Sequence, residues 1–173
     1  MAEVLLRRRL AQAGVPATVS SAGLYEGGAP ATPDGVAAMA TRGLDLGDHV
    51  SRTMTTDLVD RADLVVGMAR EHVREAVLLR PPALAKAFTL KELVRRAEAT
   101  GPRQAGEELD VWLARVALGR RREDLIGVGY DGEMDVFDPV GKGPQLYEET
   151  AVLLDDLLTR LVALAWPRAE AVA

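Results

Sequence analysis

The chain has 173 residues, of which 48% are hydrophobic and 27% are charged, and this composition is typical of a globular domain. Its net charge of −5 argues against a protein that binds nucleic acid or an anionic membrane through its overall charge. It contains no cysteine and only two histidines, which excludes disulfides and thiol nucleophiles and leaves no basis for a metal centre. Because no apolar run is long enough for a signal peptide or a membrane span, we predict a single cytoplasmic domain over residues 1–173, without cofactor or metal.

The first predicted element is a helix over residues 2–13. Val4, Leu5 and Leu10 form its apolar stripe, and Gly14 ends it. No Ser, Thr, Asp or Asn stands in front of it to cap its first amide groups. In a βα unit such a helix follows a strand, and no strand precedes this one in the sequence. We therefore expect that a strand which belongs in front of residue 1 is missing.

The next part of the chain alternates between short β-rich runs and helical patterns, which is typical of βα units around a parallel sheet. Strands are predicted at residues 17–21, 63–68 and 86–89, and the middle run is almost continuously apolar, as in a strand buried on both faces. Helices are predicted at residues 33–41, 69–79 and 90–99. The predicted fold class is α/β, a three-layer parallel sheet with helices on both faces.

Residues 100–133 differ in character and are predicted to be an insertion, with an amphipathic helix followed by a Gly-rich segment. A last helix is predicted to begin near Pro144. Its apolar stripe is expected to pack on the sheet and consists of Leu146, Leu153, Leu157, Leu161 and Leu164.

Five stretches, in this order, are similar to motifs of the low-molecular-weight protein tyrosine phosphatases. They are "MAEVLLRRRLA", "VSSAG", "GLDLGDHVSRTMT", "ADLVVGMAREH" and "DVFDPVGKG". The resemblance covers residues 1–98 and 135–166. Members of that family open with a strand and a phosphate-binding loop of the form Cys, five residues, Arg, then Ser or Thr, commonly followed by Pro-Met-Ala-Glu. Because "MAE" opens this chain, the resemblance implies a truncated sequence that lacks this strand and loop, and we expect the true start upstream of Met1.

The resemblance implies a two-step hydrolysis of phosphotyrosine. A cysteine thiolate attacks phosphorus to form a cysteinyl-phosphate intermediate, the loop Arg binds the equatorial oxygens, and an Asp protonates the leaving phenol and then activates water. The matching Asp here is Asp138 of "VFDPV", in a loop that Pro139 stiffens; taken alone, the pair is also ordinary turn chemistry. Because the Cys and the Arg are absent, we expect the chain as written to be inactive.

Three further residues match family positions. The resemblance assigns Ser21 and His49 to hydrogen bonds that brace the phosphate loop, and it places Tyr25 in one wall of the substrate cleft. Without it, Ser21 ends a strand, His49 caps a turn and Tyr25 covers the end of the sheet. The family usually has aromatic residues directly after the Asp-Pro pair, whereas Val140 and Gly141 stand here, so the resemblance does not extend to a pocket shaped for phosphotyrosine.

Two hypotheses follow. The first is a truncated phosphatase that acts on a phosphotyrosine protein, or on a small phosphomonoester, once the loop is restored. The second is a catalytically inactive relative that binds a partner or a phosphorylated ligand, with the apolar residues 125–130 placed beside the sheet. Each truly buried backbone group left unpaired costs about 1–3 kcal/mol. We therefore expect the open strand edges to form homo-oligomers or to recruit another segment.

Overall fold

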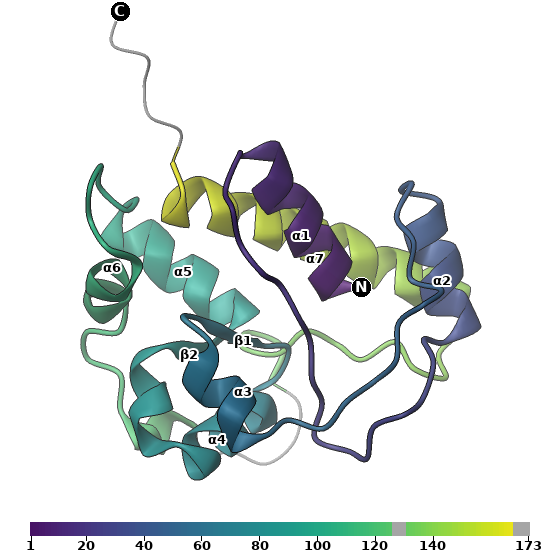
Figure 1. The fold of residues 1–173 in the computed structure, drawn as a ribbon, viewed down its shortest axis with the longest axis horizontal. Coiled ribbons are helices and arrows are strands. Elements are labelled where there is room, and N and C mark those ends of the chain that lie inside the picture. The colour runs from purple at the N-terminus through teal and green to yellow at the C-terminus, as the bar shows by residue number, and fades with distance from the viewer. Residues whose placement is uncertain (126–130, 168–173) are drawn as a thin grey trace, which may run out of the picture.

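The computed structural model describes residues 1–125 and 131–167, and it consists of helices around a small parallel sheet (Figure 1). The helices are α1 (Ala2–Gln12), α2 (Pro33–Ala40), α3 (Thr56–Arg61), α4 (Arg70–Leu79), α5 (Leu90–Thr100), α6 (Leu109–Val116) and α7 (Pro144–Ala165). The strands are β1 (Val65–Gly67) and β2 (Ala87–Thr89), and the short 3-10 helices are η1 (Pro81–Ala85) and η2 (Arg122–Leu125). None of the helices in these ranges is long and apolar enough to cross a membrane.

The two strands lie side by side in parallel, and α4 connects them, so the predicted βα organisation is confirmed here. The side chains of Val66 and Phe88 belong to the core that the sheet forms with α1, α5 and α7. Those of Val65 and Ala87 belong to a second core with α3 and α4. Helices therefore cover both faces of the sheet, as expected for an α/β fold (Figure 1).

The predicted strand at residues 17–21 is wrong, because this segment is not paired in any sheet in the described chain. Side chains take up two of its carbonyl groups instead: Arg7 Nη2 donates to Val19 O at 3.0 Å, and Arg52 Nε donates to Ser21 O at 2.8 Å. A strand exists only where a neighbouring backbone supplies the ladder of hydrogen bonds. The parallel sheet in the described ranges is therefore smaller than the expected one and contains β1 and β2 alone.

The predicted helices at 2–13, 33–41, 69–79 and 90–99 are confirmed to within one residue at each end. α1 buries Val4, Leu5 and Leu10 as predicted, and no side chain caps its first turn. α3 was not predicted, although the sequence carries its start signal: Thr55 accepts a hydrogen bond from Leu58 N at 3.4 Å.

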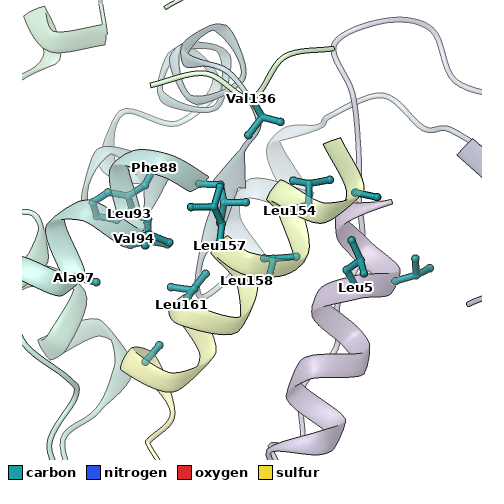
Figure 2. Close-up of a cluster of buried hydrophobic side chains, with 14 of the residues drawn as sticks. Leu5, Phe88, Leu93, Val94, Ala97, Val136, Leu154, Leu157, Leu158 and Leu161 are labelled. Carbon is teal, nitrogen blue, oxygen red and sulfur yellow. The ribbon is translucent and has the colours of Figure 1, made fainter. Parts of the chain in front are cut away.

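α7 is the central helix of the larger core (Figure 2). Leu157 and Leu161 are buried as predicted, but the most buried face also includes Leu154 and Leu158, while Leu153 and Leu164 lie at its margin. The buried face is wide because α7 packs against α1, α2 and α5 together. Asp155 ties it to α1, accepting from Arg9 Nε at 3.0 Å.

The amphipathic helix predicted in residues 100–133 is confirmed as α6, and this region is firmly attached to the rest of the fold. The Arg120 side chain, 3% exposed, donates to Ala87 O at 2.8 Å and to Glu92 Oε1 at 2.7 Å, and its guanidinium lies 4.0 Å from the centre of the Phe88 ring. The Arg120 side chain therefore binds β2 from outside the sheet. Residues 126–130, expected beside the sheet, lie outside the described residues.

Candidate functional site

Asp138 lies in the loop that leads into α7, next to the carboxyl end of β1. Val136 N donates to Met68 O at 2.7 Å, directly after β1, and the Val136 side chain is buried in the larger core. Asp138 is exposed, and its Oδ1 accepts a hydrogen bond from Val140 N at 3.1 Å, while Pro139 between them is buried. The carboxyl end of a parallel strand is the edge where α/β folds bind ligands. The carboxylate of Asp138 is thus presented to solvent at that edge.

Ser21 and His49 come together around Glu3, in the first turn of α1. Ser21 Oγ donates to Glu3 Oε2, Arg7 Nη2 donates to Glu3 Oε1, and His49 Nδ1 lies 4.0 Å from Glu3 Oε2. Burial acts to raise the pKa of Glu3, but the hydrogen bonds from Ser21 and Arg7 outweigh it and hold the pKa below its usual value. Glu3 is therefore an ionised hydrogen-bond acceptor that joins three segments of the chain.

Glu3 was not singled out from the sequence. Its only signal was its place in the "MAE" stretch, and nothing local indicates that its carboxylate reaches Ser21, 18 residues away along the chain. Ser21 and His49 both lie beside Glu3, so the structure brings these two residues together, and their role in bracing a phosphate loop stays a prediction.

A pocket of about 450 Å³ opens beside this cluster, between α1 and residues 19–21 and 45–52. Its charged lining side chains are Glu3, Arg7, Asp45, Asp48 and Arg52, together with His49. Three carboxylates against two guanidinium groups leave no excess of positive charge for an anion while His49 is neutral. Of the described residues, neither Asp138 nor Tyr25 lines this pocket, so the structure does not join the predicted site residues in one cavity.

Tyr25 lies in a loop that is held firmly by its backbone. Thr53 Oγ1 donates to Tyr25 O at 3.0 Å, and Gly23 forms an isolated parallel bridge with Thr53. At Gly27 the Tyr25 loop approaches the segment around Arg52 so closely that a Cβ atom would lie 2.8 Å from the Cα of Arg52, which only glycine permits. Tyr25 as a residue is 85% exposed, which is not the exposure of a side chain that covers the end of the sheet. Its place in a substrate cleft stays a prediction.

The arrangement offers a proton donor and acceptor in Asp138, but it offers no thiolate, because the sequence has no cysteine. Among the described residues, no group of three or more His, Asp and Glu side chains is placed to hold a metal ion. Asp138 can exchange protons with a ligand, and the side chains around Glu3 form hydrogen bonds.

Comparisons with known proteins agree with this reading of the motifs. The family model described as "Low molecular weight phosphotyrosine protein phosphatase" matches residues 1–108. A Ralstonia solanacearum protein named "Probable low molecular weight protein-tyrosine-phosphatase EpsP" is 34% identical over 134 residues, which cover 69% of this chain and 88% of that protein. The "Protein-arginine-phosphatase" of Bacillus subtilis is 28% identical over 162 residues, covering 93% of this chain and 84% of that protein.

The fold is also similar to solved structures. The low molecular weight protein tyrosine phosphatase from T. tengcongensis superposes with a TM-score of 0.67 at 26% sequence identity, over 93% of this chain and 86% of that chain. The mixed α/β architecture is therefore shared along almost the whole length, although the described sheet here has two strands.

Proposed function

Because the chain belongs to the low molecular weight phosphotyrosine protein phosphatase family, we propose that it carries the proton-donating side of a phosphomonoesterase site and that its 173 residues do not by themselves hydrolyse phosphotyrosine. The observation that carries the proposal is the absence of cysteine from the whole sequence. A cysteinyl-phosphate intermediate needs a thiolate to attack phosphorus, and no other residue type supplies that sulfur nucleophile.

Asp138 is proposed as the acid of the family reaction. Its exposure, its position at the carboxyl end of β1 and the buried Pro139 beside it support this role. In that role the carboxyl group gives its proton to the leaving oxygen, and the carboxylate then takes a proton from water. Ser21 and His49 are proposed to brace the phosphate loop in this family, and here Glu3 keeps them together.

The ligand class we propose is a phosphorylated side chain of a protein. This is what the names of the two sequence relatives have in common, since one is called a tyrosine phosphatase and the other an arginine phosphatase. Val140 and Gly141 after the Asp-Pro pair provide no aromatic ring for a phosphotyrosine. We propose Tyr25 as the aromatic side chain that would contact a phosphotyrosine ring.

A hydrolysis assay tests the proposal. The purified chain is incubated with p-nitrophenyl phosphate and with a phosphotyrosine peptide, next to the Asp138→Asn variant. We expect the same background release of phosphate from both proteins, because an acid alone forms no covalent intermediate. Turnover by the unmodified chain that collapses in Asp138→Asn would show that hydrolysis proceeds without a sulfur nucleophile, and the proposal would be wrong.

The pocket beside Glu3 supports a second candidate, a catalytically inactive module that binds a phosphorylated ligand. The lining arginines Arg7 and Arg52 could contact phosphate oxygens. The three carboxylates in the same lining oppose a dianion, so we expect binding to be weak at pH 7. Titration with phenyl phosphate, followed by the NMR amide shifts of Ser21 and His49, tests this candidate. No shift at either amide at the highest concentration of phenyl phosphate would exclude it.

A further inference from the structure

Asp135 lies three residues before Asp138 and is almost completely buried, with 3% of its surface exposed. Burial of a carboxylate is costly unless hydrogen bonds replace its water. Both of its oxygens have such a bond: Oδ1 accepts from Arg70 N at 2.8 Å, and Oδ2 accepts from Asp131 N at 2.9 Å. The side chain therefore connects two backbone segments that are far apart in the sequence.

The first of these segments is the start of α4. The N-cap of α4 is Ala69, whose methyl group cannot accept a hydrogen bond from the first amides of the helix. The carboxylate of Asp135 takes this place from another part of the chain, and its negative charge is favoured at the N-terminal end of the helix dipole. Arg70 also brings its guanidinium near, with Nε 3.8 Å from Asp135 Oδ1.

The second segment is the turn over residues 131–135. Asp135 N donates to Asp131 O at 2.7 Å, so the turn is closed by both the backbone and the side chain of Asp135. Lys91 Nζ on α5 donates to Gly132 O at 2.7 Å and attaches the turn to a second helix. Directly after it, Val136 N is bound to Met68 O at the end of β1. This turn is thus fastened to α4, α5 and β1.

The turn is followed by the buried Val136, and only two exposed residues, Phe137 and Asp138, lie between Val136 and the buried Pro139. On the far side Lys142 N donates to Pro139 O at 3.0 Å, which closes the next turn. Figure 2 shows Val136 at the border of the apolar core between α5 and α7. The Asp138 carboxylate therefore belongs to a short loop segment whose two ends are held by hydrogen bonds and burial.

We propose that Asp135 is a positioning residue: it holds the loop at the carboxyl end of β1 and thereby fixes where the Asp138 carboxylate points. The inference rests on the proposed role of Asp138 as the acid. A catalytic acid must be held in place to transfer its proton efficiently, and Asp135 supplies the anchor without contacting substrate. The alternative is that Asp135 only caps α4.

The amide of Val140 distinguishes these two roles, because Val140 N donates to Asp138 Oδ1 and its NMR shift follows the protonation of that carboxyl group. The shift is measured against pH in the full chain and in Asp135→Asn. The amide nitrogen of the Asn side chain cannot accept a hydrogen bond, so one of the two anchors is lost. Asp138→Asn identifies the titration that belongs to Asp138.

The matched control is Glu133→Gln, which removes the same charge from the same turn at a side chain that is 86% exposed. We expect the Val140 titration amplitude to fall about twofold or more in Asp135→Asn and to stay unchanged in Glu133→Gln. An unchanged amplitude in folded Asp135→Asn would overturn the proposal and leave Asp135 as a helix cap only, whatever happens to the melting temperature.

If Asp135→Asn does not fold, Asp135→Glu is the second variant. It keeps the charge and an acceptor for the start of α4, but its extra methylene displaces the turn. A reduced Val140 amplitude in the folded variant supports the proposal, and an unchanged one contradicts it. Because this readout uses neither ligand nor hydrolysis, its failure is separate from a failure of the proposed function, which the assay with Asp138→Asn decides.

Discussion

Glu3 connects the first turn of α1 with residues that are distant in the sequence, and its charge state controls those contacts. Ser21 and Arg7 donate to its two oxygens, and these bonds keep its pKa below the usual value. A carboxyl group with a lowered folded-state pKa stabilises the fold fully above its unfolded-state pKa, and this contribution is lost as the pH falls through the folded-state pKa.

We predict that Glu3→Gln lowers the free energy of unfolding at pH 7 by about 1–3 kcal/mol, because two hydrogen bonds to a charged acceptor are weakened. The difference from the unmodified chain should shrink as the pH falls from 7 through the lowered folded-state pKa of Glu3, because Glu3 is then neutral in both states. Urea unfolding across this range measures it. Glu26→Gln, at an exposed position outside the cluster, should show no such change. A gap of equal size at both ends of the range would contradict the prediction.

The identity of Gly27 is imposed by a close approach of two backbone segments. A Cβ atom there would lie 2.8 Å from two backbone atoms, the Cα of Arg52 and the carbonyl oxygen of Ser51. Gly27→Ala should therefore push the Tyr25 loop off its neighbour and destabilise the fold by about 1–3 kcal/mol, measured by thermal unfolding. Gly23→Ala is the control, because a Cβ at that position meets nothing within 4 Å. Equal melting temperatures for the two variants would speak against the close approach.

At the scale of elements, β2 is held by a buried ion pair that comes from outside the sheet. Arg120 and Glu92 are both almost fully buried, and Arg120 also binds the carbonyl groups of Leu84 and Ala87. Arg96 is a second partner of Glu92, at 2.9 Å. Removing one member of such a pair leaves the other as a buried charge with fewer partners.

We predict that Arg120→Met destabilises the protein by about 3 kcal/mol, the low end of what broken buried pairs cost, because Arg96 still neutralises Glu92. Chemical unfolding measures the loss. The adjacent Arg121→Met removes the same charge from an exposed side chain and should change stability by less than about 1 kcal/mol. If both variants lose the same stability, Arg120 is not the anchor that the structure indicates.

At the scale of the whole molecule, the two strands of the sheet differ in burial. All three residues of β2 are buried, whereas Val65 and Val66 of β1 are only partly buried. Val65 N bonds to Lys86 O, and successive amides of a strand point in opposite directions, so the amide of Val66 faces the side where the described chain has no further strand. A strand edge without a neighbouring strand can pair with another chain.

We therefore expect the protein to associate through β1 as its concentration rises, which sedimentation velocity measures. Hydrogen exchange at the Val66 amide should slow in parallel with association. Leu118, after α6, is an apolar residue with 76% of its surface exposed, and it could also cause association. Leu118→Lys is the control for this, and it should leave association unchanged. A sedimentation coefficient independent of concentration, or association that Leu118→Lys abolishes, would contradict pairing through β1.

The local part of the fold was predictable because its signals are local. Thr32 and Thr89 cap the starts of α2 and α5, and prolines and glycines mark ends, so the bounds of α1, α2, α4 and α5 were predicted to within one residue, whereas α3 was missed. The grouping of Ser21 with His49 followed from the family resemblance. Residues 17–21 failed as a strand because β-rich composition shows only that a segment suits a sheet.

The sequence by itself determined the absence of a sulfur nucleophile, the positions of the helices and the Asp-Pro pair at residue 138, since each depends on residue identity or on short-range spacing. Only the tertiary structure decided which acidic side chains join distant segments of the chain. Nothing in the local sequence distinguishes Glu3, Asp135 and Glu92 from other acidic residues. Each acquires its role from a hydrogen-bond donor that is 18, 65 and 28 residues away, respectively. A carboxylate can be buried only where distant segments bring donors to it, and that meeting is a property of the folded chain.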